Sequence, residues 1–383
     1  MTIASISNFR KTLHQFPELS TQETSTAQRV LEQFTHFPPD ETYQHLGGTG
    51  IAFIFNGELP GPTSLLRCEL DAVPVQEENT FAHRSVHDGV SHKCGHDGHM
   101  AIITAVGKKL AQNRPQKGRV VLLFQPAEET GAGALAVIED EQFKLINADF
   151  AFALHNIPGQ SLGKVFVKPG SFNCASRGIS IKLYGKTSHA AYPDNGVSPA
   201  LAMSKIIQLL PKIPEQIDEF SLVTLVAATL GTLDTAGNAA FGTSPGEASI
   251  MATLRTTSNT SMESMMQYAC KIITQCATEF GLTVKCEWSE IFHACRNTQA
   301  GFEHVVAACH ELNIPCTTLT EAYRWSEDFG KLMDVSKEGA MFTLGAGLDS
   351  PQLHNPDYDF PDSLIVLGRD IFLQIIRGIN GIK

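Results

Sequence analysis

The feature of this sequence that most constrains its fold is a change of pattern in the middle of the chain. Before residue 177 and after residue 293, short apolar runs alternate with helical patterns, as in a buried sheet with helices between its strands. Between these points, strand-like and helical runs follow the order β-α-β-β-α-β, the ferredoxin-like arrangement. The pattern predicts an α/β fold in which residues 1–176 and 294–383 form one domain and residues 177–293 form an inserted domain.

Local signals place the first elements of the larger domain. Ser20 and Glu23 have the spacing of a capping box and predict a helix that runs to about Phe34. Apolar runs punctuated by Gly and Pro predict buried strands at Ile51–Phe55, Leu65–Leu70, Val120–Phe124 and Phe150–Leu154.

Length, composition and charge exclude several classes of function. A chain of 383 residues is longer than one core usually spans, which agrees with two domains. A net charge of −11 argues against nucleic acid or an anionic membrane as the partner, but it leaves a small-molecule substrate open. No apolar run is long enough to span a membrane and the start lacks a signal-peptide pattern, so we expect a cytoplasmic protein with reduced cysteines.

The densest chemical signal is the run Cys94-Gly95-His96-Asp97-Gly98-His99. A cysteine and a histidine two residues apart can place a thiolate and an imidazole on one metal ion, and both are good ligands for Zn²⁺ and its neighbours. Taken by itself, the run fits equally well a glycine-rich turn with a buried cysteine and solvated histidines.

A second signal, Gln125-Pro126-Ala127-Glu128-Glu129, directly follows a predicted buried strand. Two carboxylates at such a place are costly unless they are paired or bound to metal, although a solvated acidic turn is a common alternative. Neighbouring strand residues point to opposite faces, so both carboxylates can serve one site only if the strand has already become a turn. Pro126, which cannot donate to a sheet ladder, favours that turn.

Further candidates follow other predicted strands. His155 closes the strand Phe150–Leu154, His354 follows the glycine-rich stretch 345–347, and Asp71 follows the strand Leu65–Leu70. Each residue alone is more often structural than functional. Because ligands in α/β sheets gather at the carboxyl ends of strands, the combination predicts a two-metal site with a nearby base, and Asp71 is expected to orient a ligand.

Eight ordered segments together resemble the M20 peptidase superfamily, most closely its amidohydrolase branch of hippurate hydrolases, N-acyl-amino-acid deacetylases and auxin-conjugate hydrolases. The resemblance covers nearly the whole chain. Besides the cysteine and glutamate motifs above, the segments are His14–Ser20, Asp71–Pro74, Leu154-His155, Gly185–Ala191, Ser326–Phe329 and His354–Pro356.

The resemblance implies a metal-dependent hydrolase that cleaves the amide bond of small N-acyl amino acids, with an inserted lid or dimerisation domain. It implies two divalent metal ions (Zn, Mn, Co or Ni) and, through the inserted domain, a homodimer or higher oligomer. The implied metal ligands are Cys94, His96, Glu129, His155 and His354. Glu128 resembles the general base, His189 the group that stabilises the tetrahedral intermediate, and Asn238 and Arg255 the groups that hold the substrate α-carboxylate.

The sequence departs from the branch at three places. Glu69 stands where the branch has Asp, the residues after Asn238 differ from the usual Asn-Val-Ile-Pro, and the Asp usual near Ser176-Arg177 is missing. None of these changes a ligand or the base.

Three other functions are alternatives to this one. If Cys94 were a catalytic nucleophile with a histidine base, Glu129, His155 and His354 would have no role. A non-catalytic metal carrier would need neither Glu128 nor His189. A dipeptidase or carboxypeptidase of the same superfamily is the nearest alternative, and the cysteine in the metal motif argues against it.

Overall fold

The chain divides into two compact units. The computed structural model describes residues 3–232, 237 and 239–382. Unit 1 consists of Met1–Phe172, Cys295–Tyr323 and Glu327–Lys383, and unit 2 of Asn173–Ala294 and Arg324–Ser326. Unit 2 therefore begins at Asn173, where the sequence predicted Arg177, and it includes a short return of the chain near residue 325.

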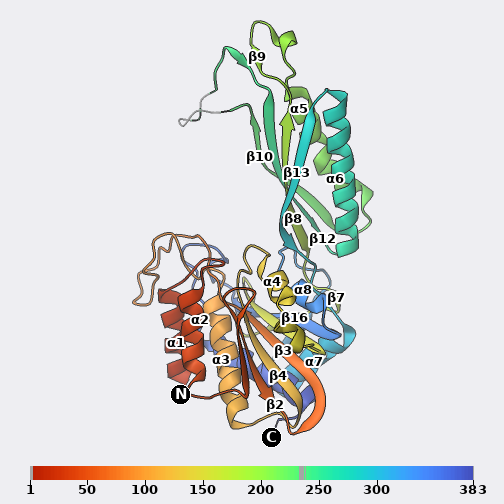
Figure 1. The fold of residues 1–383 in the computed structure, drawn as a ribbon. Helices are drawn as coiled ribbons and strands as arrows, with labels where there is room; N and C mark the ends of the chain where they lie inside the picture. The colour runs from red at the N-terminus through yellow and green to blue at the C-terminus, as the bar shows by residue number, and fades with distance from the viewer. Residues whose placement is uncertain (1–2, 233–236, 238, 383) are drawn as a thin grey trace. The chain divides into compact units, whose positions relative to one another are not determined.

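Unit 1 is built on a mixed sheet of eight strands in the order β1-β2-β4-β3-β5-β16-β6-β15 (Figure 1). The four neighbours β4, β3, β5 and β16 are parallel, whereas β2 is antiparallel both to β4 and to its hairpin partner β1. The predicted α/β class is therefore confirmed. The strands are β1 (Glu41–Leu46), β2 (Gly50–Asn56), β3 (Leu59–Glu69), β4 (Lys117–Gln125), β5 (Phe150–Pro158), β6 (Val165–Val167), β15 (Cys316–Thr318) and β16 (Glu338–Gly347), with β7 (Gly170–Ser171) and β14 (Arg296–Asn297) pairing separately.

Helices cover both faces of this sheet. α3 connects β3 to β4 and α4 connects β4 back to β5, and right-handed crossovers in opposite directions place them on opposite faces. α3 packs against α1, α2 and α9, and α4 packs against α8. None of the helices in the described ranges has the length and apolar character needed to cross a membrane. The helices are α1 (Ile3–Gln15), α2 (Thr24–Phe34), α3 (His96–Gln112), α4 (Gly133–Glu139), α7 (Gln299–Glu311), α8 (Phe329–Asp334) and α9 (Ser363–Asn380), with a 3₁₀ turn η1 (Phe143–Leu145).

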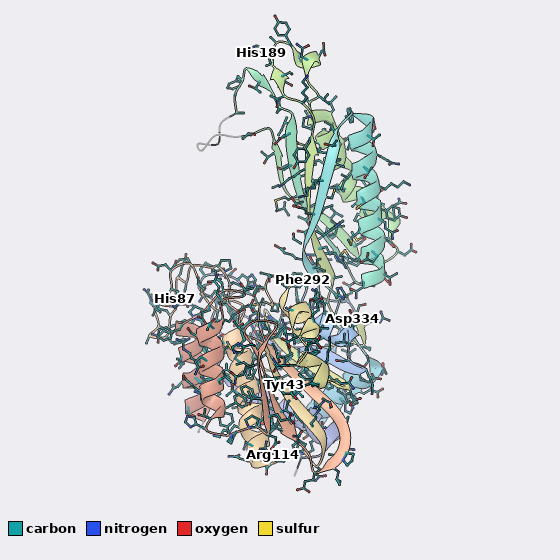
Figure 2. All side chains as sticks on the ribbon, viewed as in Figure 1. Tyr43, His87, Arg114, His189, Phe292 and Asp334 are labelled. Atoms are coloured by element: carbon teal, nitrogen blue, oxygen red, sulfur yellow. The ribbon has the colours of Figure 1, made fainter. Side chains whose placement is uncertain are left out.

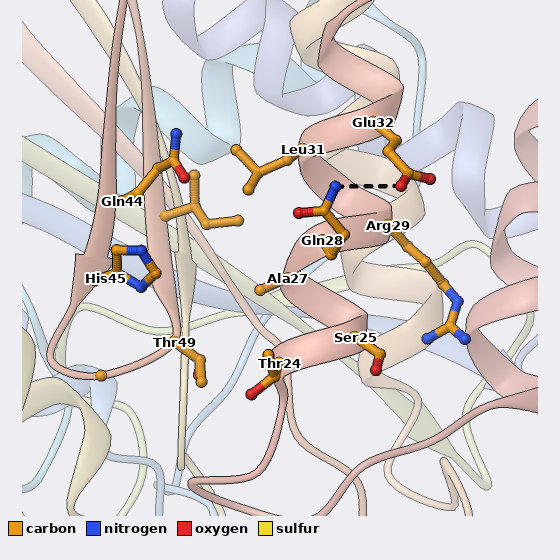
Figure 3. Close-up of a pocket in the computed structure, with 12 residues that line it drawn as sticks. Thr24, Ser25, Ala27, Gln28, Arg29, Leu31, Glu32, Gln44, His45 and Thr49 are labelled. Carbon is orange, nitrogen blue, oxygen red and sulfur yellow. Dashed lines mark hydrogen bonds between the residues drawn. The ribbon is translucent and has the colours of Figure 1, made fainter.

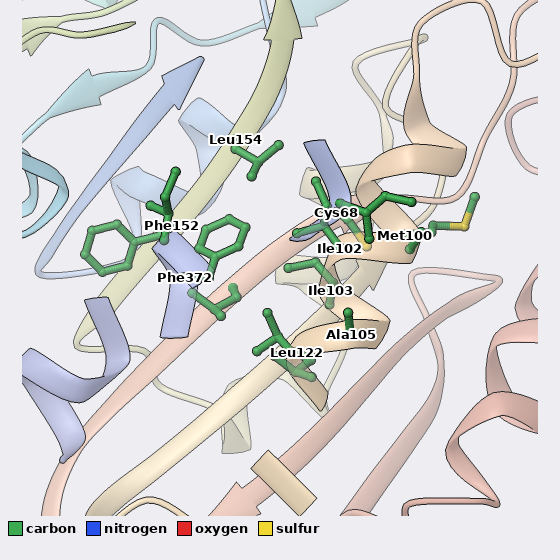
Figure 4. Close-up of a cluster of buried hydrophobic side chains, with 14 of the residues drawn as sticks. Cys68, Met100, Ile102, Ile103, Ala105, Leu122, Phe152, Leu154 and Phe372 are labelled. Carbon is green, nitrogen blue, oxygen red and sulfur yellow. The ribbon is translucent and has the colours of Figure 1, made fainter. Parts of the chain in front are cut away.

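The core of unit 1 lies between the sheet and the layer that contains α3 and α9 (Figure 4). Leu122 of β4 and Phe152 of β5 are fully buried there against Ile102 of α3 and Phe372 of α9. Fully burying one such side chain stabilises the fold by about 1.5–3 kcal/mol. This packing positions the ends of the strands and the side chains located there.

Unit 2 has the element order β8-α5-β10-β12-α6-β13, with an antiparallel sheet ordered β10-β12-β8-β13. Its buried face, which includes Ile181, Ile250 and Leu254, packs on α5 and α6. The elements are β8 (Ala175–Tyr184), β9 (Ser188–His189), η2 (Pro193–Asn195), α5 (Ala200–Leu209), η3 (Leu210–Gln216), β10 (Ser221–Leu230), β11 (Thr243–Ser244), β12 (Glu247–Thr256), α6 (Asn259–Glu279) and β13 (Thr283–Phe292).

The predicted capping box at Ser20 and Glu23 is wrong. α2 begins at Thr24, so Glu23 is the residue before the helix, and its side chain makes no cap hydrogen bond to it. Its carboxylate accepts hydrogen bonds from Thr49 and from the main chain of Ala127 instead, while Ser20 donates to Asp71. Both side chains therefore form hydrogen bonds with residues distant in the sequence instead of capping α2.

Candidate metal centre

The predicted site residues of unit 1 gather at the sheet edge where four parallel strands end. Because β3, β4, β5 and β16 run the same way, their carboxyl ends lie at one edge. The chain reaches this edge repeatedly, at Asp71 after β3, Glu128 and Glu129 after β4, His155 in β5 and His354 after β16.

Cys94 and His96 reach the same edge through the start of α3. His96 is the first residue of this helix, which the sequence analysis did not predict. Gly95 precedes it with φ of 95°, and a Cβ atom at this position would lie 2.5 Å from Oδ1 of Asn156. Glycine is therefore required here by both the backbone and the close approach of Asn156.

Cys94, His96 and His155 form a buried group in which one ligand atom from each lies within 4.8 Å of the others. Cys94 Sγ is 3.4 Å from His155 Nε2. The Nδ1 atoms of His96 and His155 lie 2.8 Å from the main-chain oxygens of Asp71 and Asn156, respectively. A carbonyl oxygen can only accept, so each Nδ1 donates and a neutral ring carries its lone pair on Nε2, as a metal ligand does.

Glu128 and Glu129 lie in a tight turn that follows β4 immediately. Ala127 has φ of 50° and donates its N–H to Glu23 at 2.8 Å, and a Cβ on Gly133 would lie 1.6 Å from the oxygen of Pro126. The turn releases the two glutamates from strand alternation. Their carboxylate oxygens lie 3.9 Å (Glu128) and 3.7 Å (Glu129) from Nε2 of His96.

His354 lies beside Glu129 and Cys94 in a second group, again with one ligand atom from each within 4.8 Å of the others. Its Nε2 is 3.6 Å from Oε1 of Glu129, and its side chain is 50% exposed. Its backbone N–H donates to the oxygen of Lys93, which ties this loop to the Cys94 loop. Cys94 belongs to both groups.

Asp71 connects candidate ligands. Its Oδ2 accepts hydrogen bonds from Ser20 Oγ at 2.7 Å and from the N–H of Glu129 at 3.0 Å, and its Oδ1 is 3.5 Å from Nδ1 of His96. Burial opposes both charged forms, but the nearness of the two groups lowers the pKa of Asp71 and raises the pKa of His96 to about 9.

Negative charge is in excess around Arg67. We call Arg67, Glu69, Glu128, Glu327 and Asp328 the Arg67 cluster. The fully buried Arg67 guanidinium is shared by Glu69, Glu327 and Asp328. Burial, and after it the charges of Glu327 and Glu129, raise the pKa of Glu128 well above its usual range. Burial also raises the pKa of Glu327 to about 7.

The donors of this edge fit two divalent cations. Within the described chain, His96 Nε2 and Glu129 Oε1 are buried without a hydrogen-bond partner. Burying such atoms is costly unless a hydrogen-bond partner or a metal ion compensates, and a metal ion bound at this edge would do so. A thiolate, imidazoles and carboxylates are the ligands that Zn²⁺ and neighbouring metals take, and the two groups that share Cys94 give one place for each of two ions.

Three residues of this region were missed by the sequence analysis. Arg67 stands inside an apolar run, and a charge in a buried strand was the available signal. Glu327 lies in the segment Ser326–Phe329, to which the family resemblance assigned no role. Its Oε1 is 3.6 Å from His155 Nε2. His99 bridges Glu69 and Asn156 at 2.7 and 2.6 Å.

The remaining predicted residues belong to unit 2. His189 lies at the end of this unit opposite Phe292 (Figure 2), and its Nδ1 accepts the N–H of Ala191 at 3.0 Å, which leaves Nε2–H as a donor in the neutral ring. Arg255 donates to Oγ of Ser326 at 2.9 Å. Asn238 lies outside the described residues.

A pocket of about 750 Å³ lies between α2 and the β1–β2 hairpin (Figure 3). Its wall carries Gln28 and Glu32, which are hydrogen-bonded to each other, and His45 faces them from the hairpin. No predicted site residue lines it. The strand-end edge, rather than this pocket, therefore carries the chemistry.

Comparison with known proteins gives one family. The model of peptidase family M20/M25/M40 matches residues 65–378. An N-acetyl-L-cysteine deacetylase of Bacillus subtilis is 33% identical over 73% of this chain and 66% of its own length. An N-acetyldiaminopimelate deacetylase of Bacillus subtilis is 30% identical over 93% of this chain and 95% of its own. A hippurate hydrolase of Campylobacter jejuni is 28% identical over 96% of this chain and 94% of its own.

Solved structures share the fold along the whole chain. A Staphylococcus aureus protein described as a putative aminohydrolase superimposes with a TM-score of 0.85 at 24% identity, covering 98% of this chain and 96% of its own. A Bacillus subtilis protein described as a dinuclear metal binding peptidase from the M20 family gives a TM-score of 0.82 at 23% identity, covering 99% and 98%.

Proposed function

The chain belongs to peptidase family M20/M25/M40, and on this premise we propose that it is a metal-dependent amidohydrolase that removes the acyl group from small N-acyl amino acids. The relatives named for N-acetylcysteine, N-acetyldiaminopimelate and hippurate support this class of substrate. The observation that carries the proposal is the meeting of Cys94, His96, Glu129, His155 and His354 at one sheet edge beside a buried Glu128.

The five residues would hold two divalent ions, with Cys94 serving both. When bound, such ions polarise a carbonyl oxygen and make water a nucleophile near neutral pH. Asp71 would keep the His96 ring oriented through the contacts described above, and the Nδ1 hydrogen bond to Asn156 would do the same for His155.

Glu128 would serve as the general base. Burial raises the pKa of its carboxyl, so it can accept a proton from the attacking water and pass it to the leaving nitrogen of the amide. In the structure one of its oxygens lies near His96 and the other accepts the N–H of Asp328 at 3.4 Å, which keeps the carboxyl turned toward the site.

His189 and Arg255 would act from unit 2. The Nε2–H of a neutral His189 can donate to the oxygen that becomes negative during the reaction, an effect worth about 3–4 kcal/mol in known cases. Arg255, and Asn238 by the family resemblance, would bind the substrate α-carboxylate, since a guanidinium pairs with a carboxylate in two parallel hydrogen bonds. By the family resemblance, the chain would form a homodimer or higher oligomer through the inserted domain, and His189 would serve its own chain or a second copy.

A substrate comparison tests this function. Zn²⁺- or Co²⁺-loaded protein is assayed on N-acetyl-L-cysteine, N-acetyldiaminopimelate, hippurate and their α-carboxamides, with dipeptides as the alternative class. We expect hydrolysis of at least one acid, strong discrimination against its carboxamide, and loss of activity with a chelator. Faster cleavage of dipeptides would favour the peptidase alternative, and no cleavage of any compound would contradict the proposal.

A further inference from the structure

We propose that Glu327 is an additional metal ligand, directed at the ion that Cys94 and His155 hold. The proposal rests on the metal-dependent function proposed above and extends its ligand set from five residues to six. The family resemblance implies no role for Glu327, whose contacts support the assignment.

Glu327 lies next to the start of α8 and is buried among the strand ends. Its side chain is 3% exposed. One carboxylate oxygen, Oε2, is 3.0 Å from Nη1 of Arg67, so this half of the group is hydrogen-bonded within the protein. The other oxygen, Oε1, is 3.6 Å from Nε2 of His155. The carboxylate therefore joins the arginine on one side and the candidate centre on the other.

The contact between Glu327 and His155 joins two electron-pair donors. Nδ1 of His155 donates to the carbonyl oxygen of Asn156, so a neutral ring presents a lone pair at Nε2. The separation of 3.6 Å exceeds a hydrogen bond. Cys94 Sγ lies 3.4 Å from the same nitrogen. A sulfur and an oxygen thus both lie within 3.6 Å of one imidazole nitrogen, and all three are atom types that bind a Zn²⁺-like ion.

Arg67 alone does not account for the charge of Glu327. The same guanidinium also serves Glu69 and Asp328. Asp328 differs from Glu327 in a useful way, because its two oxygens accept hydrogen bonds from Arg67, Gln125 and the N–H of Ala134. Asp328 is therefore a matched control. It is the next residue in the chain, is also buried and binds the same arginine, but its two oxygens already accept hydrogen bonds from other protein donors.

Metal binding by Glu327→Gln and Asp328→Asn, compared with wild type, tests the assignment. Glutamine keeps the size of the side chain and can still accept from Arg67. Titration of chelator-treated protein with Co²⁺ should show one of the two ions bound more than about 100-fold more weakly in Glu327→Gln, beyond the ~10–100-fold typical of residues that only orient ligands. The thiolate-to-cobalt band should remain, while the visible d–d bands shift. Asp328→Asn should bind both ions as wild type does.

Wild-type-like Co²⁺ binding by Glu327→Gln, or equal weakening in both variants, would overturn the proposal. If Glu327→Gln does not fold, a crystal structure of the Zn²⁺-loaded wild type decides: we expect a Glu327 oxygen about 2.0–2.2 Å from a metal, and a distance outside the coordination range contradicts it. If wild type binds no metal, the proposed function itself fails; if wild type binds two ions and hydrolyses substrate while Glu327→Gln binds normally, only this assignment fails.

Discussion

Two clusters of buried charge flank the N-terminus of α3, and they are balanced differently. In the Arg10 cluster (Arg10, His14, Glu77, Lys93, Asp97, Asp359 and Asp362), the protein supplies its own cations. Arg10 pairs with Asp97 at 2.9 Å and Asp359 at 2.8 Å, and Lys93 pairs with Glu77 at 2.5 Å. In the Arg67 cluster, one guanidinium serves three carboxylates, and Glu128 has a carboxylate neighbour in Glu327.

The difference shows that a dense group of acids and histidines is not enough to indicate a metal site. By distance alone His14, Asp97 and Asp359 could hold an ion, since their ligand atoms lie within 4.8 Å of one another. Arg10 already lies between Asp97 and Asp359, and His14 is hydrogen-bonded to both Asp97 and Glu77. We therefore interpret the Arg10 cluster as structural, because Arg10 and Lys93 already pair with its carboxylates, and we propose metal binding at the strand-end edge.

The largest expected effect is a difference in metal content and kcat between variants of the adjacent residues Glu128 and Glu129. Glu128→Gln keeps the shape and removes the proton acceptor, so it should keep two metals per chain and lower kcat by about 10²–10⁴-fold. Glu129→Gln should lose metal first and regain part of its activity in excess metal. Metal analysis and kcat of both variants are the measurements. The reverse pattern would exchange the two roles, and two active variants would exclude the hydrolytic mechanism.

The next effect compares two buried cysteines. Cys94→Ala should lose metal, because the thiolate belongs to both candidate groups. Cys68→Ala, a control in the core of the same unit, should keep its metal and lose only packing, since Cys68 lies among apolar side chains. Metal content after gel filtration checks this. Full metal content in Cys94→Ala would remove the cysteine from the ligand set.

Removing Arg10 should lower the free energy of unfolding and leave the metal affinity unchanged. Arg10→Met leaves the buried carboxylate of Asp97 without its arginine, and breaking a buried pair in this way costs about 3–5 kcal/mol. Urea unfolding measures the loss, and metal titration of the folded variant should give two ions with near wild-type affinity. Loss of metal without loss of stability would contradict the division between the clusters.

The smallest effect is a dependence of stability on pH through His14. Although burial opposes the charged form, Asp97 and Glu77 raise the pKa of His14 to about 9. Because the pKa of His14 is higher in the folded protein than in the unfolded chain, its protonation stabilises the fold. This stabilisation is complete below the unfolded pKa of about 6.5 and is lost as the pH rises through the folded pKa of about 9. The difference in unfolding free energy between wild type and His14→Gln should fall by on the order of 3 kcal/mol from pH 6 to pH 10. A difference independent of pH would show that folding does not raise the pKa of His14.

The sequence predicted that the candidate ligands lie close together, because the carboxyl ends of parallel strands share one edge of the sheet. It did not predict α3, because the run Cys94–His99 was interpreted either as a metal motif or as a glycine-rich turn; Gly95 is required by the close approach of Asn156. Glu23 was assigned to a capping box on local spacing, yet its carboxylate binds Ala127 across the unit. Arg67 and Glu327 acquire their roles from partners far away in the chain, which local patterns do not contain.

Metal stoichiometry of the wild-type chain tests the central claim most directly. Chelator-treated protein is titrated with Zn²⁺ or Co²⁺ by calorimetry, and the melting temperature is followed in parallel. We predict two ions per chain and a rise in Tm as they bind, because ions that bind the folded state alone stabilise it. Saturation at zero ions or at one, or binding that leaves Tm unchanged, would contradict the claim that the donors at the strand ends form a two-metal centre.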